Sequence, residues 1–320
     1  MIYQFLEVEN SLIAFGGILA AFALTVILTG RLSTYLPKDG GREFAHDGKL
    51  SAGKPRGAGI IFVLVFVAAT LMFVPLQVEL AVYLVLVVLC MLTGFFDDAA
   101  EKPWGEYRKG LLDLCIAVMT AVTFLQHNPS EVELAFFHTR FTLNPIVFAV
   151  LTIILVWASV NVTNCADGVD GLSGTLAIIT LVTIYYIAQI KGTPGNFSFP
   201  ILLFVACLLG YLWYNATPSK LMMGDAGSRA MGLMIAIAIL KTGCPFLYIP
   251  VALVLILDGG LGLVKVFLLR FLKIHIFKNT RMPLHDHVRK VLGWSNTQTV
   301  YRFAIIQIVL SAAVIYGMQV

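Results

Sequence analysis

The chain has 320 residues, of which 59% are hydrophobic and only 12% are charged, and its formal net charge is +4. This composition excludes an ordinary soluble domain and is typical of a membrane-embedded protein. No long basic run alternates with aromatic residues, so we expect no nucleic-acid partner. The five cysteines are scattered without a C-x-x-C pair, which favours small buried side chains over a metal or redox site.

Ten apolar segments divide the chain, each close to the ~20 residues that cross a ~30 Å hydrocarbon layer. We predict transmembrane helices, because an open strand would leave its backbone amides unpaired in the lipid bilayer. The predicted helices cover residues 11–30, 57–76, 78–96, 110–126, 145–163, 171–190, 198–214, 229–243, 246–271 and 299–318. We therefore expect an all-α, polytopic membrane protein of about ten transmembrane helices, forming a single domain over residues 1–320.

Lysine and arginine residues gather in alternate loops, and the opposite loops hold only Arg140, Lys191 and Lys241. By the positive-inside rule the basic loops are cytoplasmic, and an even number of spans then puts both termini on the extracytoplasmic side. The polar motifs fall on the same predicted side, in loops 31–56, 97–109, 161–171, 215–228 and 272–298. Random placement would divide them between both faces, so we predict one cytoplasmic site.

The first motif is the pair Asp97–Asp98, which closes the third predicted helix. Adjacent carboxylates repel each other, so one would hold a proton unless a cation neutralises the pair. Magnesium suits such a pair, because it prefers hard oxygen ligands and bridges carboxylates to phosphate oxygens. A solvated helix end is the alternative interpretation of the pair taken alone.

The second motif, N-V-T-N-C-A-D-G-V-D-G-L, spans residues 161–172. Its Asn161, Asn164, Asp167 and Asp170 recur every three residues, which on a helical path would place them on one face. The neighbouring glycines allow close approach of the backbone. We predict that the four polar side chains bind a ligand, although Asp170 has a helix cap as its alternative role.

The third motif, G-D-A-G-S at residues 224–228, projects the carboxylate of Asp225 from a tight loop. A cap of the next helix is the alternative role for Asp225 or Ser228. Asn215 lies upstream, after an aromatic stretch that we expect to anchor at the membrane interface.

The fourth motif is His285–Asp286–His287, in the long loop before the last predicted helix. Two imidazoles at this spacing can face a phosphate or bind a metal. A zinc site would need more cysteine or histidine ligands nearby, so we disfavour it.

Two further features are weaker on their own. The segment around His46 and Lys49, continuing into residues 54–59, is basic and glycine-rich, which suits anionic phosphates. Asp258 stands inside the ninth predicted helix, where we expect it to face protein rather than lipid.

Together, and in this order, the motifs resemble the polyprenyl-phosphate N-acetylhexosamine-1-phosphate transferase superfamily. The resemblance runs from His46 to about Arg302, and residues 161–172 and 224–228 are its most specific parts. Within the superfamily the chain looks most like the phospho-N-acetylmuramoyl-pentapeptide transferase branch. This implies transfer of phospho-N-acetylmuramoyl-pentapeptide from its UDP-linked donor to undecaprenyl phosphate, releasing UMP and making the first lipid-linked peptidoglycan intermediate.

The resemblance also implies a Mg²⁺ cofactor, the bacterial cytoplasmic membrane as location, and a homodimer as one expected assembly. The residues that it implies to be catalytic are Asp97, Asp98, Asp225, His285 and His287, with Asp225 as the metal ligand. The residues that it implies to bind substrate are Lys49, Lys109, Asn161, Asn164, Asp167, Asp170, Asn215 and Met222. Direct attack by the lipid phosphate and a covalent phospho-enzyme on an aspartate both stay open.

Three departures from the branch bear on the donor sugar. Asp286 replaces the middle one of three consecutive histidines, and Met222 replaces a phenylalanine that stacks on uracil. The stretch from Leu292 to Val300 looks closer to enzymes that transfer GlcNAc-1-phosphate from UDP-GlcNAc to prime teichoic acid or O-antigen synthesis, which is the alternative function. A secondary transporter is the remote alternative, but residues 1–160 and 161–320 show no internal repeat.

Overall fold

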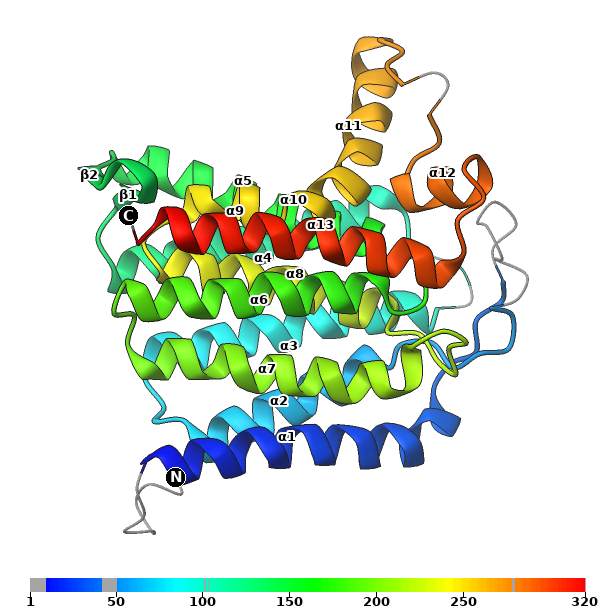
Figure 1. The fold of residues 1–320 in the computed structure, drawn as a ribbon, viewed down its shortest axis with the longest axis horizontal. Coiled ribbons are helices and arrows are strands. Elements are labelled where there is room, and N and C mark those ends of the chain that lie inside the picture. The colour runs from blue at the N-terminus through cyan, green and yellow to red at the C-terminus, as the bar shows by residue number, and fades with distance from the viewer. Residues whose placement is uncertain (1–9, 42–50, 101, 103, 278–279, 320) are drawn as a thin grey trace.

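The computed structural model describes residues 10–41, 51–100, 102, 104–277 and 280–319. These residues form a bundle of long helices with one small hairpin (Figure 1). The long helices are α1 (Asn10–Leu32), α2 (Gly59–Phe73), α3 (Val78–Asp98), α4 (Glu106–His127), α5 (Pro145–Ala166), α6 (Leu172–Ile190), α7 (Gly195–Asn215), α8 (Gly224–Lys241) and α13 (Asn296–Gly317). The hairpin pairs β1 (Glu131–Leu134) with β2 (Thr139–Thr142) in antiparallel register.

The ninth predicted helix is broken into several pieces. These are α9 (Tyr248–Val251), α10 (Leu253–Leu255), a π-helical turn (Ile256–Gly260), α11 (Leu261–Phe267) and a second π-helical turn (Leu268–Leu272). The arms Pro245–Val251 and Leu253–Leu272 meet at a bend of 70°. Helix α11, in the second arm, projects away from the bundle (Figure 1). Short elements complete the described chain: α12 (Leu284–Lys290) and 3₁₀ turns at Ser33–Tyr35, Ala135–Phe137 and Pro245–Leu247.

Each of the ten predicted segments is helical in the structure, and the prediction of an all-α polytopic membrane protein is confirmed. Within the described chain, seven helices are long and apolar enough to cross a membrane, and the bent pair makes an eighth if it counts as one span. Two predicted spans do not qualify. Helix α2 has only 15 residues, and α8 carries Asp225, Arg229 and Lys241.

Helix α8 forms the centre of the bundle, and all of its residues except the last are buried. It packs mainly against α3 and α5. Small residues allow this close approach: a Cβ on Gly94 of α3 would lie 2.4 Å from the carbonyl oxygen of Asp225, and one on Gly59 of α2 would lie 2.1 Å from the amide nitrogen of Gly227. The backbone at the start of α8 is therefore held between α2 and α3.

The two ends of the bundle differ. Helix α1 begins and α13 ends at the end of the bundle that carries the β1–β2 hairpin, while α12 and the described residues that follow α1 and precede α2 (33–41 and 51–58) lie at the opposite end (Figure 1). This agrees with the even number of spans in the prediction. That the end with the termini faces outward stays a prediction.

Candidate active site

Three carboxylates converge where α3 ends and α8 begins. Arg56, in the segment before α2, places Nε 2.8 Å from Oδ1 of Asp98 and Nη2 3.3 Å from Oδ1 of Asp225. Lys109 of α4 forms an ion pair with Asp97, and its Nζ lies 3.2 Å from Oδ2 of Asp225. Asp225 is thus bridged to both members of the aspartate pair, each time through one cationic side chain.

The two adjacent aspartates are fixed by different partners. Oδ1 of Asp97 accepts a hydrogen bond from the backbone N–H of Trp104 at 2.7 Å. Oδ2 of Asp98 accepts one from the N–H of Ala226 at 3.2 Å, in the first turn of α8, where a helix favours negative charge. Both side chains are buried, so the alternative of a solvated helix end does not hold.

Arg56 is a site residue that the sequence predictions missed. Burial alone would lower its pKa, but the carboxylates of Asp98, Asp225, Asp39 and Asp97 outweigh this and raise the pKa above its ordinary value. The guanidinium therefore stays charged and holds the carboxylates together. Its place in a basic, glycine-rich segment was the available signal.

A cavity of about 630 Å³ opens beside the carboxylate cluster, and we call it the donor cavity. The predicted residues that line it are Asn164, Asp167, Asp170, Asn215, Met222 and His285. Lys54, Arg56 and Arg289 also line it, which gives the cavity three basic side chains. Three carboxylates, those of Asp167, Asp170 and Asp286, line the cavity as well, so its wall carries charges of both signs.

The Asn/Asp motif does not follow one helical path, contrary to the prediction. Helix α5 ends at Ala166, and Gly171 has a φ of +80°, so Asp167 and Asp170 lie in a turn. Asn161 does not line the donor cavity, because its Nδ2 donates instead to the carbonyl of Trp157 at 2.9 Å.

The other members of this motif have defined partners. Asn164 donates from Nδ2 to Oγ of Ser228 at 2.9 Å, next to Asp225. Asp167 accepts a hydrogen bond from Oγ of Ser173 at 2.5 Å. Asp170 accepts one from the N–H of Ser219 at 3.1 Å, which draws the turn toward the segment after α7.

Asn215 and Met222 connect the loops around the cavity. Oδ1 of Asn215 accepts from the N–H of Gly171, and its Nδ2 donates to the carbonyl of Leu221, both at 2.9 Å. The N–H of Met222 donates to the carbonyl of Pro55 at 2.9 Å, and its carbonyl accepts from the N–H of Ala58 at 3.0 Å. Asn215 and Met222 therefore line the donor cavity, and their hydrogen bonds also hold together the loops that form its wall.

The structure separates the two predicted histidines. His285 is 3% exposed and lines the donor cavity. His287 does not line it, and its Nδ1 accepts a hydrogen bond from the N–H of Arg281 at 3.3 Å. Lys49 lies outside the described residues.

The carboxylate cluster supplies the donor atoms that Mg²⁺ prefers. Within the described part of the chain, no three His, Cys, Asp or Glu side chains form a ready-made metal site. Mg²⁺ is usually held by one or two carboxylates together with substrate phosphates and water rather than by an all-protein cage. Asp225, with Asp97 or Asp98, fits that mode, and Arg56 and Lys109 are the cations that now contact the same oxygens.

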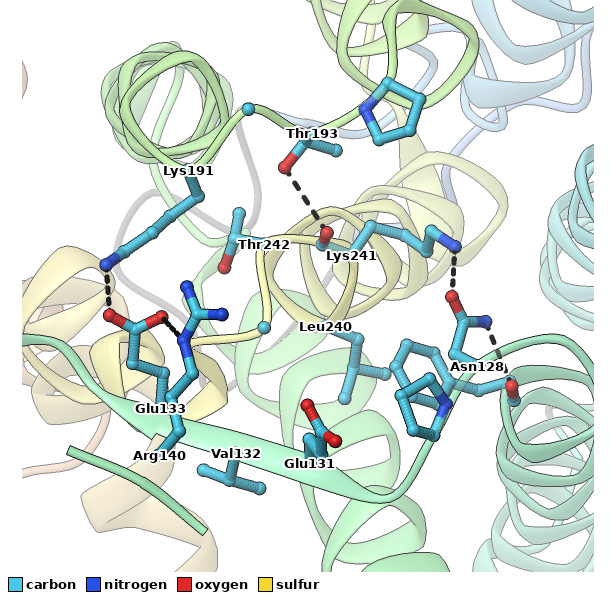
Figure 2. A pocket seen from close by; sticks show the side chains of 15 residues that line it. Asn128, Glu131, Val132, Glu133, Arg140, Lys191, Thr193, Leu240, Lys241 and Thr242 are labelled. Atoms are coloured by element: carbon cyan, nitrogen blue, oxygen red, sulfur yellow. Dashed lines mark hydrogen bonds and ion pairs between the residues drawn. The ribbon is translucent and has the colours of Figure 1, made fainter. Parts of the chain in front are cut away.

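A smaller cavity of about 260 Å³ lies beside β1, at the end opposite the donor cavity (Figure 2). In its lining, Glu133 contacts both Lys191 and Arg140. Lys241 donates to Asn128 at 2.7 Å and to Glu79 at 2.9 Å. We assign these contacts to the attachment of the hairpin and of α8, and place the functional site in the donor cavity.

The fold and the site define a polytopic membrane protein with a buried acidic cluster beside a large cavity that basic and acidic side chains line. Comparison with known proteins gives the family. The family model described as "Glycosyl transferase family 4" matches residues 80–243. A phospho-N-acetylmuramoyl-pentapeptide-transferase of Treponema pallidum (strain Nichols) is 39% identical over 306 residues, which cover 90% of this chain and 84% of the relative.

Two more distant relatives carry the same name. The protein of Bartonella quintana (strain Toulouse) is 28% identical over 238 residues, covering 68% of this chain and 66% of the relative. That of Thermoanaerobacter sp. (strain X514) is 27% identical over 312 residues, covering 93% and 96%. The chain belongs to glycosyl transferase family 4 and, within it, to the phospho-N-acetylmuramoyl-pentapeptide-transferase family.

Proposed function

We propose that this protein transfers phospho-N-acetylmuramoyl-pentapeptide from its UDP-linked donor to undecaprenyl phosphate, releasing UMP. The product would be the first lipid-linked intermediate of peptidoglycan synthesis. One observation carries the proposal: Asp97, Asp98 and Asp225, from two helices, meet between Arg56 and Lys109 at the edge of the donor cavity. The names of the relatives support the same reaction.

The two substrates would occupy different parts of the site. The donor is a soluble diphosphate, and the donor cavity offers it Lys54, Arg56 and Arg289. The acceptor is a membrane-bound phosphate, and the end of α3 brings Asp97 and Asp98 to the end of a membrane span. We place this end on the cytoplasmic side of the bacterial inner membrane, where the basic loops are expected.

Charge neutralisation is the main task of the site, because several phosphates must meet in a partly desolvated cleft. Arg56 and Lys109, which contact Asp225, would supply positive charge for these phosphates. Mg²⁺, held by Asp225 with Asp97 or Asp98, would supply further neutralisation and polarise the diphosphate. The homodimer expected from the resemblance stays a prediction.

The chemistry exchanges one phosphate–oxygen bond for another. An oxygen of the lipid phosphate attacks the phosphorus that carries the sugar, the bond from that phosphorus to the oxygen bridging it to UMP breaks, and UMP leaves. Asp97 or Asp98 would take the proton of the lipid phosphate before a direct attack. In the alternative route, one of these carboxylates attacks first and the lipid phosphate attacks the resulting phospho-enzyme.

Transfer of GlcNAc-1-phosphate is the second candidate function. Met222 and Asp286, two positions where the chain departs from the muramoyl branch, both line the donor cavity. These departures therefore affect the surface that would meet the nucleotide-sugar.

A donor panel tests the proposal. Purified protein with undecaprenyl phosphate and Mg²⁺ should release UMP from UDP-N-acetylmuramoyl-pentapeptide, and omission of the lipid or of Mg²⁺ should stop the release. Exclusive use of UDP-GlcNAc would replace the proposed donor by the second candidate. Failure with both donors would remove the transferase assignment.

A further inference from the structure

Asp258 is an acidic residue that the reaction as described does not use. It lies in the π-helical turn Ile256–Gly260, between α10 and α11, and is completely buried. An isolated carboxylate is very costly to bury, so its hydrogen-bond partners are central to its role.

Both oxygens of Asp258 contact His285. Oδ1 accepts a hydrogen bond from the backbone N–H of His285 at 2.7 Å, and Oδ2 lies 2.8 Å from Nδ1 of its ring. The carboxylate thus holds the backbone and the ring of one residue at once, from a turn 27 positions earlier in the chain. This contact fixes the position of α12 as well as the ring orientation.

The other edge of the ring lies against Gly168 in the wall of the donor cavity. A Cβ on Gly168 would lie 2.2 Å from Nε2 of His285, so the ring fits only because residue 168 has no side chain. Gly168 lies between Asp167 and Asp170, and all three residues line the donor cavity with His285. The ring is therefore oriented from both sides, with Nδ1 toward Asp258 and Nε2 toward the cavity wall.

We propose that Asp258 is a positioning residue: it binds the Nδ1–H of His285 and so presents Nε2 to the diphosphate of the donor. The absence of a side chain at Gly168 leaves room for the His285 ring. A carboxylate on Nδ1 leaves Nε2 as the nitrogen that meets the substrate, as an acceptor when the ring is neutral and as a donor when it is protonated. The inference rests on the proposed function for the identity of the donor, but the Asp258–His285 geometry stands without it.

Asp258→Asn is the central variant, because an amide keeps the size of the side chain while its NH₂ group donates to Nδ1. The ring then carries its proton on Nε2, which is the wrong tautomer for the role. We expect UMP release to fall about 10- to 100-fold. Asp258→Glu restores the carboxylate and should regain a large part of that loss.

A double-mutant comparison separates positioning from a general structural role. If Asp258 acts through His285, then Asp258→Asn should cause no further loss of turnover in a His285→Ala background. A similar fold-loss in both backgrounds would show a structural role and overturn the inference.

A second measurement does not depend on turnover. The full chain in detergent, labelled with ¹⁵N-histidine, should show the Nδ1 of His285 protonated, with the signal assigned by its absence in His285→Ala. Asp258→Asn should move the proton to Nε2. An unchanged His285 signal in Asp258→Asn would overturn the inference. Absence of UMP release from the wild type would remove only the proposed function, because the NMR measurement does not depend on turnover.

Gly168→Ala tests the opposite edge of the ring. The added methyl group should displace His285, change the same NMR signal and lower turnover. Gly195→Ala is the matched control, because a Cβ there meets no atom within 4 Å, and it should change neither. A normal His285 signal in Gly168→Ala would contradict the packing on which the inference depends.

Discussion

Arg229 of α8 forms a buried ion pair with Asp113 of α4, one helical turn below the contact between Asp225 and Lys109 on the same two helices. Each partner follows its counterpart by four positions, so the two pairs connect α4 and α8 at successive helical turns. Asn161 of α5 also reaches Asp113, with Nδ2 at 3.4 Å from Oδ2. The deeper pair therefore fixes the register that brings Lys109 to Asp225.

Removal of one partner of this pair should destabilise the protein strongly. Asp113→Asn leaves Arg229, which is 2% exposed, without its counter-charge, and such a loss costs about 3–5 kcal/mol. The measurement is thermal unfolding in detergent. The double variant Asp113→Asn with Arg229→Met has no unpaired charge and should recover most of the stability. Equal destabilisation in the single and double variants would show that the pair does not determine the stability of this interface.

Asp225→Asn should abolish UMP release while the protein stays folded. The carboxylate contacts both Arg56 and Lys109 and is the proposed Mg²⁺ ligand, and an amide provides only one neutral oxygen. We expect a loss of about 10³-fold or more, because the change removes charge stabilisation at the reacting groups. Thermal unfolding checks the fold, and near-normal turnover at any Mg²⁺ concentration would remove the metal assignment.

Arg56→Lys should impair turnover although it keeps the charge. The guanidinium reaches Asp98 through Nε and Asp225 through Nη2, and a single ammonium group does not reproduce that fork. We expect about a tenfold loss or more, which corresponds to about 1.4 kcal/mol. Arg270→Gln is the control, because its ion pair with Glu106 is exposed and such pairs contribute little. Equal activity of both variants would show that the bridge is dispensable.

Hydropathy was sufficient to locate the ten helical segments, because burial in a membrane requires long apolar runs. The sequence also predicted Asp97, Asp98 and Asp225 as site residues, because carboxylates are costly to place at the ends of apolar helices without a function. In both cases the signal is local, within one segment of the chain. The structure brings these three residues together, as the site prediction requires.

The missed features depend on contacts between distant segments. Arg56 meets Asp225 across 169 positions, and Asp258 meets His285 across 27, so no local pattern connects them. The hairpin was also missed, because its strands have only four residues each, although the alternation in Glu131–Leu134 was a usable signal. The period of three in the Asn/Asp motif was misleading, because α5 ends at Ala166, so Asp167 and Asp170 lie beyond the helix that carries Asn161 and Asn164.

Acid should weaken the hairpin end of the molecule through Glu133. Burial alone would raise the pKa of Glu133, but Lys191 and Arg140 outweigh this and lower it below the ordinary value of 4.5. A carboxylate whose pKa is lower in the folded state stabilises the protein above pH 4.5 and loses this contribution as the pH falls through the folded-state value. Glu133→Gln should therefore be less stable than the wild type at pH 7, by about 1 kcal/mol. The difference in thermal unfolding temperature should shrink as the pH falls below 4.5, and a difference that stays constant with pH would show that the charge of Glu133 does not stabilise the hairpin.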